Sequence, residues 1–170
     1  LDLYPLTAEL THHVLAGDRQ GAEALLGARF PEQWPGRVLV ERAFACPVQL
    51  LHEDPDRVLW GGRVLVTRPA AGEPRRVVGS VVFDGAPSES GVVEVAYGID
   101  GPCQGQGFAT EGTDAVVGWA LAQAGVRRVT AATPPWHRGS LRVLEKLGMK
   151  PAGARPHDVF GELLVFARDR

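Results

Sequence analysis

The sequence has few cysteines, few lysines and no long apolar run. Its two cysteines, Cys46 and Cys103, lie far apart, and neither has a second cysteine or a histidine at metal-ligand spacing, which argues against a zinc site or a disulfide framework. The longest stretch without a charged residue is residues 115–126, shorter than the roughly 18 to 20 residues that a membrane span needs. We therefore expect no metal and no membrane partner.

The net charge and the composition further restrict the classes of protein to which this chain can belong. A formal net charge of -2 argues against a broad nucleic-acid-binding surface, which would need a basic excess. The first residues carry no basic region followed by a cleavable apolar run, so no secretory signal is visible and a cytoplasmic location is expected. With 170 residues, 45% of them hydrophobic and 22% charged, the chain is expected to form a single globular domain over residues 1–170.

The first third of the chain predicts one strand followed by helices. Residues 1–7 alternate apolar and polar positions as a strand does, and Thr7 has the chemistry of a helix cap. A helix is expected over 19–28, where apolar residues recur at helical spacing before two prolines stop it. A further helix candidate covers 41–51, with a proline inside it.

From residue 57 onward, strand-like runs separated by turn residues predict an antiparallel meander, and the later segments alternate helix and strand. This order predicts a mixed sheet with helices on its faces. The expected strands are 58–60, 64–66, 77–83, 92–99 and 127–132, followed by one or two more over 154–159 and 163–166. The expected helices are 113–124 and 140–147.

Glycine is the residue in excess: the chain has 21, where about twelve would be expected at average usage. The surplus gathers after the strand 92–99, where a strand runs into a glycine-rich turn and then a helix. Such a turn aligns free backbone N–H groups with the positive end of a helix dipole, which together bind phosphate. A loop that merely needs tight turns is the alternative.

Two common phosphate-binding motifs do not fit this loop. A Walker A loop needs Gly-Lys-Ser/Thr, and no lysine precedes Lys146. A dinucleotide fingerprint needs a third glycine in the first βαβ unit, whereas the segment from Gly105 to Thr110 lacks it and comes late in the chain. The sequence therefore excludes a P-loop NTPase and argues against a dinucleotide-binding fold.

The segment Gln104-Gly-Gln-Gly107-Phe-Ala109 does match another pattern, the Q/R-x-x-G-x-G/A loop of the GNAT N-acetyltransferases. Downstream, residues 136–149 follow that family's N-x-x-S-x-x-v-l-e-K-l-G-F pattern. Residues 3–7 and 109–112 resemble the RimJ/RimL branch, which acetylates ribosomal-protein N-termini. The resemblance implies an α/β (α+β) GNAT fold: a twisted, mixed, mostly antiparallel sheet of about seven strands, with helices on both faces and strands 4 and 5 splayed to hold acyl-CoA.

The resemblance also implies which residues bind acetyl-CoA. The loop amides would hold the pyrophosphate, and the strand before the loop would hydrogen-bond the pantetheine, with Gly98 allowing a bulge or a close approach. The residues implied are Val95, Tyr97, Gly98, Ile99, Gln104, Gly105, Gln106, Gly107, Phe108, Ala109, Thr110, His137 and Ser140.

His137 is a departure, because the family has an asparagine there that touches the pantetheine arm. An imidazole can still donate one hydrogen bond, but its reach and shape differ, which leaves the acyl-chain preference open. The alternative is that His137 is a surface loop residue. Cys103 is interpreted as structural, since direct transfer needs no covalent nucleophile.

Transfer to an amine needs a base, and the resemblance implies Glu94, which stands alone in an apolar strand where burial should raise its pKa. The alternative is an outward-facing, solvated carboxylate; Asp84 and Glu89 are the reserve candidates. Ser140 matches the family serine and is expected to donate toward the CoA sulfur, or else to cap a helix. The tyrosine that many relatives use for this step has no counterpart at its usual position.

These residues predict an N-acetyltransferase that moves an acetyl group from acetyl-CoA to a primary amine by direct attack in a ternary complex. The alternative is a catalytically silent acyl-CoA-binding or interaction module. An α-amino group is easier to deprotonate than a lysine, which favours peptide N-termini or small amines; aminoglycosides and a homodimeric state stay open. Four aromatic residues could wall the acceptor pocket or belong to the core: Trp34, Phe44, Trp60 and Trp136.

Overall fold

The computed structural model describes residues 1–32, 58–69 and 71–170, so the expected helix over 41–51, together with Trp34, Phe44 and Cys46, lies outside the described residues. The described chain forms a seven-stranded sheet in the order β1-β2-β3-β4-β5-β7-β6. All neighbouring strands are antiparallel except β4 and β5, which are parallel. The strands are β1 (Asp2–Pro5), β2 (Gly62–Val66), β3 (Val77–Phe83), β4 (Val92–Ile99), β5 (Arg128–Thr133), β6 (Lys150–His157) and β7 (Gly161–Asp169).

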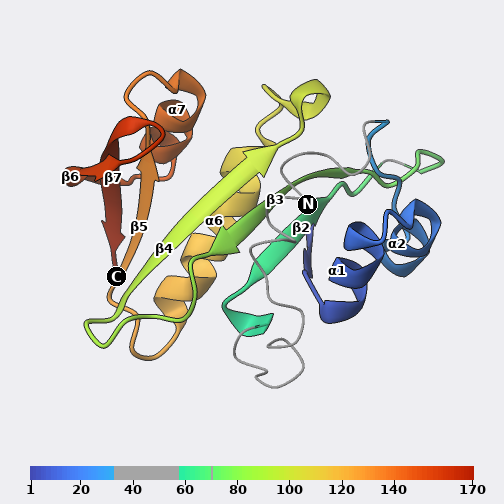
Figure 1. Ribbon diagram of the computed structural model, residues 1–170, viewed down its shortest axis with the longest axis horizontal. Helices are drawn as coiled ribbons and strands as arrows, with labels where there is room; N and C mark the ends of the chain where they lie inside the picture. Colours follow the sequence, from blue (N-terminus) through green and yellow to red (C-terminus); the bar gives the residue numbers. More distant parts are fainter. Residues whose placement is uncertain (33–57, 70) are drawn as a thin grey trace.

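Helices cover both faces of this sheet, which confirms the predicted fold class (Figure 1). The alternation of side chains along β2 shows the two layers: Leu65 belongs to the apolar cluster under α6, whereas Val64 and Val66 belong to the cluster under α1 and α2. Among the described residues, none of the helices combines the length and apolar character that crossing a bilayer requires. The helices are α1 (Ala8–Leu15), α2 (Arg19–Leu26), α6 (Phe108–Ala122) and α7 (Arg138–Lys146), with a 3₁₀ turn at Gly101–Cys103.

Local capping chemistry sets the ends of the first two helices. The Thr7 hydroxyl accepts a hydrogen bond from the Leu10 N–H at the start of α1, as predicted, and the Asp18 carboxylate accepts one from Gly21 at the start of α2. Gly27, with φ of +57°, adopts the left-handed conformation that ends α2. The helix expected over 19–28 therefore stops two residues earlier.

Other boundaries differ from the prediction. Val58 and Leu59 are helical and Trp60 lies in a turn, so the strand expected over 58–60 is wrong: three apolar residues do not distinguish a strand from a buried turn. The ring centroid of Trp60 lies 5.2 Å from that of Phe83, in an edge-on contact, and 4.9 Å from that of Trp119. Trp60 is therefore a core residue. Helix α6 begins five residues before the predicted start, and β6 and β7 are longer than predicted.

Strands β4 and β5 separate partway along their length, which confirms the predicted splay. Their parallel pairing covers only Val92–Glu94 against Arg128–Thr130. Beyond this point β5 continues to pair with β7, while β4 keeps β3 on its other side. Figure 1 shows the two strands diverging above their shared segment. The β5-facing edge of β4 from Val95 to Ile99 therefore has no strand partner among the described residues.

The far end of β4 lies very close to β3. A Cβ atom at Gly79 would come within 2.2 Å of the Gly98 carbonyl oxygen and 2.9 Å of the Ile99 Cα. The β3–β4 register runs without a shift from Gly79 opposite Ile99 to Phe83 opposite Val95. The bulge expected at Gly98 is therefore absent from this ladder. The other expectation, a close approach of the pantetheine at Gly98, stays a prediction.

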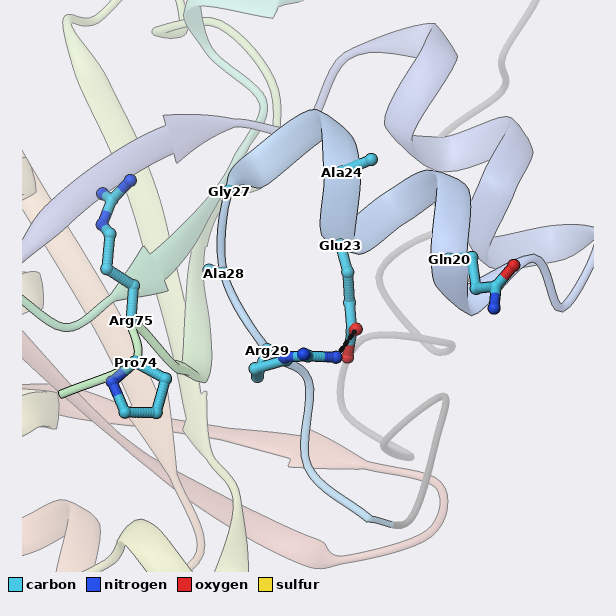
Figure 2. Close-up of a pocket in the computed structure, with 8 residues that line it drawn as sticks. All are labelled: Gln20, Glu23, Ala24, Gly27, Ala28, Arg29, Pro74 and Arg75. Atoms are coloured by element: carbon cyan, nitrogen blue, oxygen red, sulfur yellow. Dashed lines mark hydrogen bonds and ion pairs between the residues drawn. The ribbon is translucent and has the colours of Figure 1, made fainter. Parts of the chain in front are cut away.

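The turn after α2 is held by Glu23. Its carboxylate accepts hydrogen bonds from the Phe30 N–H at 3.0 Å, from Arg19 at 2.9 Å and from Arg29 at 3.1 Å, and these bonds hold the pKa of Glu23 below its ordinary value. Figure 2 shows Glu23 reaching from α2 to Arg29. Both residues line a pocket of about 430 Å³. Glu23 thus fixes the path of the chain that leaves α2.

Gly79→Ala tests the close approach between β3 and β4. Because the new methyl group meets a backbone carbonyl that cannot move freely, the substitution should lower the free energy of unfolding by about 1 to 3 kcal/mol. Gly118→Ala is the matched control: it lies in α6 with open space around its Cβ position, and it should raise stability by about 0.5 to 1 kcal/mol. Urea denaturation of both variants provides the measurement, and equal effects would contradict the assigned packing.

Candidate functional site

A cavity of about 550 Å³ opens where β4 leaves β5, between the glycine-rich loop and α7. The residues predicted to bind acetyl-CoA line it, apart from Val95, whose side chain is buried in the core, and Gln106. The lining residues are Tyr97, Gly98, Ile99, Cys103, Gln104, Gly105, Gly107, Phe108, Ala109, Thr110, His137, Gly139, Ser140, Arg142, Val143 and Lys146.

The loop reaches α6 through two glycines in the left-handed region, Gly105 with φ of +77° and Gly107 with φ of +88°. Gly107 is the N-cap of α6 and offers no side-chain cap. The first N–H groups of an α-helix have no partner within the helix, and the residues that carry them line the cavity. The start of this 15-residue helix is therefore suited to bind an anion.

The two glutamines of the loop brace it from within. The Gln104 side-chain amide donates to the Ile99 carbonyl at 3.0 Å, and the Gln106 side-chain amide donates to the Pro102 carbonyl at 3.3 Å. The first bond ties the loop back to the end of β4, and the second ties it to the 3₁₀ turn. The side chains of both residues therefore shape the loop, while its backbone stays available to a ligand.

Two cations on α7 were not predicted as part of the site. Arg142 and Lys146 line the cavity together with Gly139 and Val143, a spacing of three, four and seven residues that places them on one helix face. The helical period from Gly139 was readable in the sequence and could have identified both. They add positive charge opposite the start of α6.

The backbone of Ser140 is held from both sides. Its N–H donates to His137 Nδ1 at 3.0 Å, and its carbonyl accepts from the Tyr97 hydroxyl at 3.2 Å. His137, not Ser140, is therefore the N-cap of α7, and the alternative that Ser140 caps this helix is wrong. His137 is exposed as a loop residue, yet it lines the cavity as well.

These contacts determine which hydrogen-bond donors His137 and Tyr97 present to the cavity. Since Nδ1 of His137 accepts the Ser140 N–H, a neutral imidazole carries its proton on Nε2. Burial raises the pKa of Tyr97, so its phenol remains a hydrogen-bond donor at neutral pH. Tyr97 thus brings a hydroxyl from β4 to the first turn of α7.

Glu94 lies where the β4–β5 pairing ends, opposite Thr130, and its surroundings differ from the expected apolar ones. Both of its carboxylate oxygens accept hydrogen bonds from Arg155 of β6, at 2.5 and 2.8 Å, and its side chain is 24% exposed. This contact raises the pKa of Arg155. The sequence did not reveal this partner, because 61 residues separate the two in the chain.

The reserve acids lie in different places. Asp84 follows β3, and its backbone N–H donates to the Glu94 carbonyl at 2.9 Å; its charge also acts on Arg155. Glu89 is exposed in the turn before β4, at the end of the strand remote from the glycine-rich loop. Asp84 is thus the nearer of the two to Glu94.

Cys103 lies in the 3₁₀ turn at the edge of the cavity. Burial, with a smaller effect from the Asp100 charge, raises the pKa of its thiol. A protonated thiol is a weak nucleophile. This environment is consistent with the structural interpretation of Cys103.

His137→Ala tests the capping role of the imidazole. Loss of the bond to the Ser140 N–H should lower the free energy of unfolding by about 1 kcal/mol, as removal of other N-caps does. His137→Asn should restore most of that loss, because asparagine is among the preferred N-cap residues. Chemical denaturation measures both variants; an alanine variant as stable as the parent would refute the cap.

Comparison with known proteins agrees with this geometry. The family model described as "Acetyltransferase (GNAT) domain" matches residues 12–150. The uncharacterized N-acetyltransferase YjdG of Bacillus subtilis (strain 168) is 33% identical over 72 residues, which are 42% of this chain; the match spans 43% of YjdG, less than half its length.

Solved structures share the fold at low identity. A ribosomal-protein-S5-alanine acetyltransferase from Vibrio fischeri superposes with a TM-score of 0.66 at 14% identity, covering 98% of this chain and 91% of that one. The aminoglycoside acetyltransferase AAC(6')-Ib, solved with coenzyme A, superposes with a TM-score of 0.56 at 18% identity. The match covers 99% of this chain and 94% of that one. From the family match over most of its length, this chain belongs to the GNAT acetyltransferase domain family.

Proposed function

We propose that this protein transfers an acetyl group from acetyl-CoA to a primary amine by direct attack in a ternary complex. The observation that carries the proposal is the open edge of β4 from Val95 to Ile99, which leads into the loop Gln104–Ala109 and the uncapped start of α6. Family membership and a solved relative in complex with coenzyme A support it.

The cavity offers complementary groups for the pyrophosphate and the pantetheine arm of acetyl-CoA. Free amides at the start of α6 suit the pyrophosphate, because they combine hydrogen-bond donors with the helix dipole. Arg142 and Lys146 add charge on the facing side. The amide-rich pantetheine arm suits the open edge of β4, to which it would add as a strand does. The Nε2–H of His137 is a donor in the place of the family asparagine.

Glu94 is proposed as the base that takes the proton of the attacking amine, directly or through a water molecule. Arg155 holds its carboxylate in one orientation through two hydrogen bonds, and a general base has to be positioned in this way to take a proton. The exposed fraction of the side chain leaves a path for the proton to solvent.

The leaving thiolate needs modest help, since a thiol has a pKa of about 8.5. Ser140 is proposed to donate its hydroxyl hydrogen bond toward the sulfur. Tyr97 supports this step: its protonated phenol already contacts the Ser140 carbonyl. Tyr97 of β4 is therefore a candidate for the role that many relatives give to a tyrosine at another position.

The acceptor is proposed to be a peptide N-terminus or a small amine, in line with the resemblance to the RimJ/RimL branch. An α-amino group with a pKa near 8 is partly neutral at physiological pH. The fold neighbours act on different amines, a ribosomal-protein alanine in one and an aminoglycoside in the other. The acceptor class therefore has to come from the residues of this chain.

Gly107→Val tests the binding of acetyl-CoA. A β-branched side chain is strained at φ of +88° and projects where the phosphates would lie, so stabilisation of the protein by CoA should disappear. Gly72→Val is the control, since Gly72 has a φ of +91° and open space around it, and it lies outside the cavity. Thermal unfolding with and without CoA gives the readout; a parent protein that CoA does not stabilise would overturn the proposed function.

Glu94→Gln tests the base. The amide keeps an acceptor for Arg155 but cannot take a proton, so kcat should fall about 100-fold or more while CoA affinity stays near that of the parent. Thiol release from acetyl-CoA across an amine panel is the assay. Arg155→Gln is the control: if Glu94 serves only as an ion-pair partner, both variants lose the same activity. CoA binding without turnover for any amine would instead favour the silent module.

A further inference from the structure

Four rings from two separate turns form an exposed cluster, which we call the ring cluster: Trp136 and His137 before α7, and His157 and Phe160 at the β6–β7 turn. The ring centroids lie 6.0 Å apart for Trp136 and His137, 6.2 Å for Trp136 and Phe160, and 4.8 Å for His157 and Phe160. Trp136 is 63% exposed and Phe160 is 48% exposed. These two residues thus contribute large apolar surfaces that the core does not use.

The turns that carry the ring cluster are held by its own histidines. His137 Nδ1 accepts the Ser140 N–H, and His157 Nδ1 accepts the N–H groups of Val159 and Phe160 at 3.1 and 3.3 Å. Each imidazole therefore fixes the backbone beside an exposed aromatic ring. A surface prepared in this way loses little conformational entropy when a ligand covers it.

The ring cluster is continuous with the proposed site on two sides. His137 lines the acetyl-CoA cavity. Along β6, His157 follows Arg155 by two residues, so both side chains lie on the same face of the hairpin, and Arg155 holds Glu94. One member of the ring cluster, His157, therefore shares a hairpin face with Arg155, which holds the carboxylate proposed to deprotonate the amine.

The phosphate end of the cavity lies elsewhere. Arg142 and Lys146 follow His137 by five and nine residues along α7, which corresponds to roughly 7 and 13 Å of helix. The cations mark the end of the cavity suited to the adenosine phosphates. This separation favours the acceptor over the adenine ring as the group that covers the ring cluster.

We infer that the ring cluster binds the acceptor and selects primary amines with an aromatic or flat apolar group close to the amino nitrogen. This inference rests on the proposed function and names its substrate class. Aromatic partners gain from edge-to-face and offset contacts with Trp136 and Phe160 beyond simple burial. A purely hydrophilic polyamine or aminoglycoside offers no such group.

The test compares two amines that differ by one phenyl ring, phenethylamine and ethylamine, at saturating acetyl-CoA. The parent should prefer phenethylamine by roughly tenfold or more in kcat/KM. Trp136→Ala should remove most of that preference, mainly through the KM of phenethylamine, with little change for ethylamine. Val159→Ala is the matched control: Val159 is 78% exposed on the β6–β7 turn beside Phe160, has no ring, and its substitution should keep the preference.

Calorimetric titration of both amines into the CoA-saturated protein separates this inference from the proposed function. If no amine turns over, tighter binding of phenethylamine that Trp136→Ala abolishes still supports the ring cluster as an acceptor site. Equal kcat/KM values, or equal binding affinities, of the parent protein for the two amines would overturn the inference. A Trp136→Ala variant that loses CoA affinity but keeps the preference would assign the rings to the adenine instead.

Discussion

The end of the β4–β5 pairing at Glu94 and Thr130 is the constraint on which the site depends. Paired strands satisfy each other's backbone groups, so a strand that leaves its neighbour inside a sheet exposes an edge that another chain or ligand can use. Here the separation opens a cavity lined by β4 on one side and α7 on the other. The glycine-rich loop lies at its mouth because β4 runs directly into it.

Side-chain contacts tie β4 to two elements with which it forms no strand pairing, α7 and β6. Tyr97 of β4 reaches the Ser140 carbonyl, and Arg155 of β6 reaches back to Glu94. The Tyr97 contact spans the opening, and the Arg155 contact lies at the point where the β4–β5 pairing ends. The same bonds orient the groups proposed for proton transfer, which links the stability of the opening to its chemistry.

Most of the fold and the glycine-rich loop could be predicted from the sequence, because the residue patterns that specify them are local. Caps at Thr7, glycines at turns and the order of strands and helices predicted the sheet, although a three-residue apolar run at 58–60 was wrongly assigned as a strand. The surroundings of Glu94, the proposed base, were harder to predict. Glu94 was expected in apolar surroundings, since its neighbours in the strand are apolar, but its partner Arg155 comes from a distant hairpin.

The sequence by itself determined the elements whose causes lie within a few residues: the glycine-rich turn into α6, the helical face that carries Arg142 and Lys146, and the motifs of the family. Tertiary structure alone decided which groups meet. The splay was already implied by the family resemblance, whereas the Glu94–Arg155 pair and the ring cluster join segments far apart in the chain. Such contacts depend on how the sheet twists and where the hairpins pack, and no local pattern encodes them.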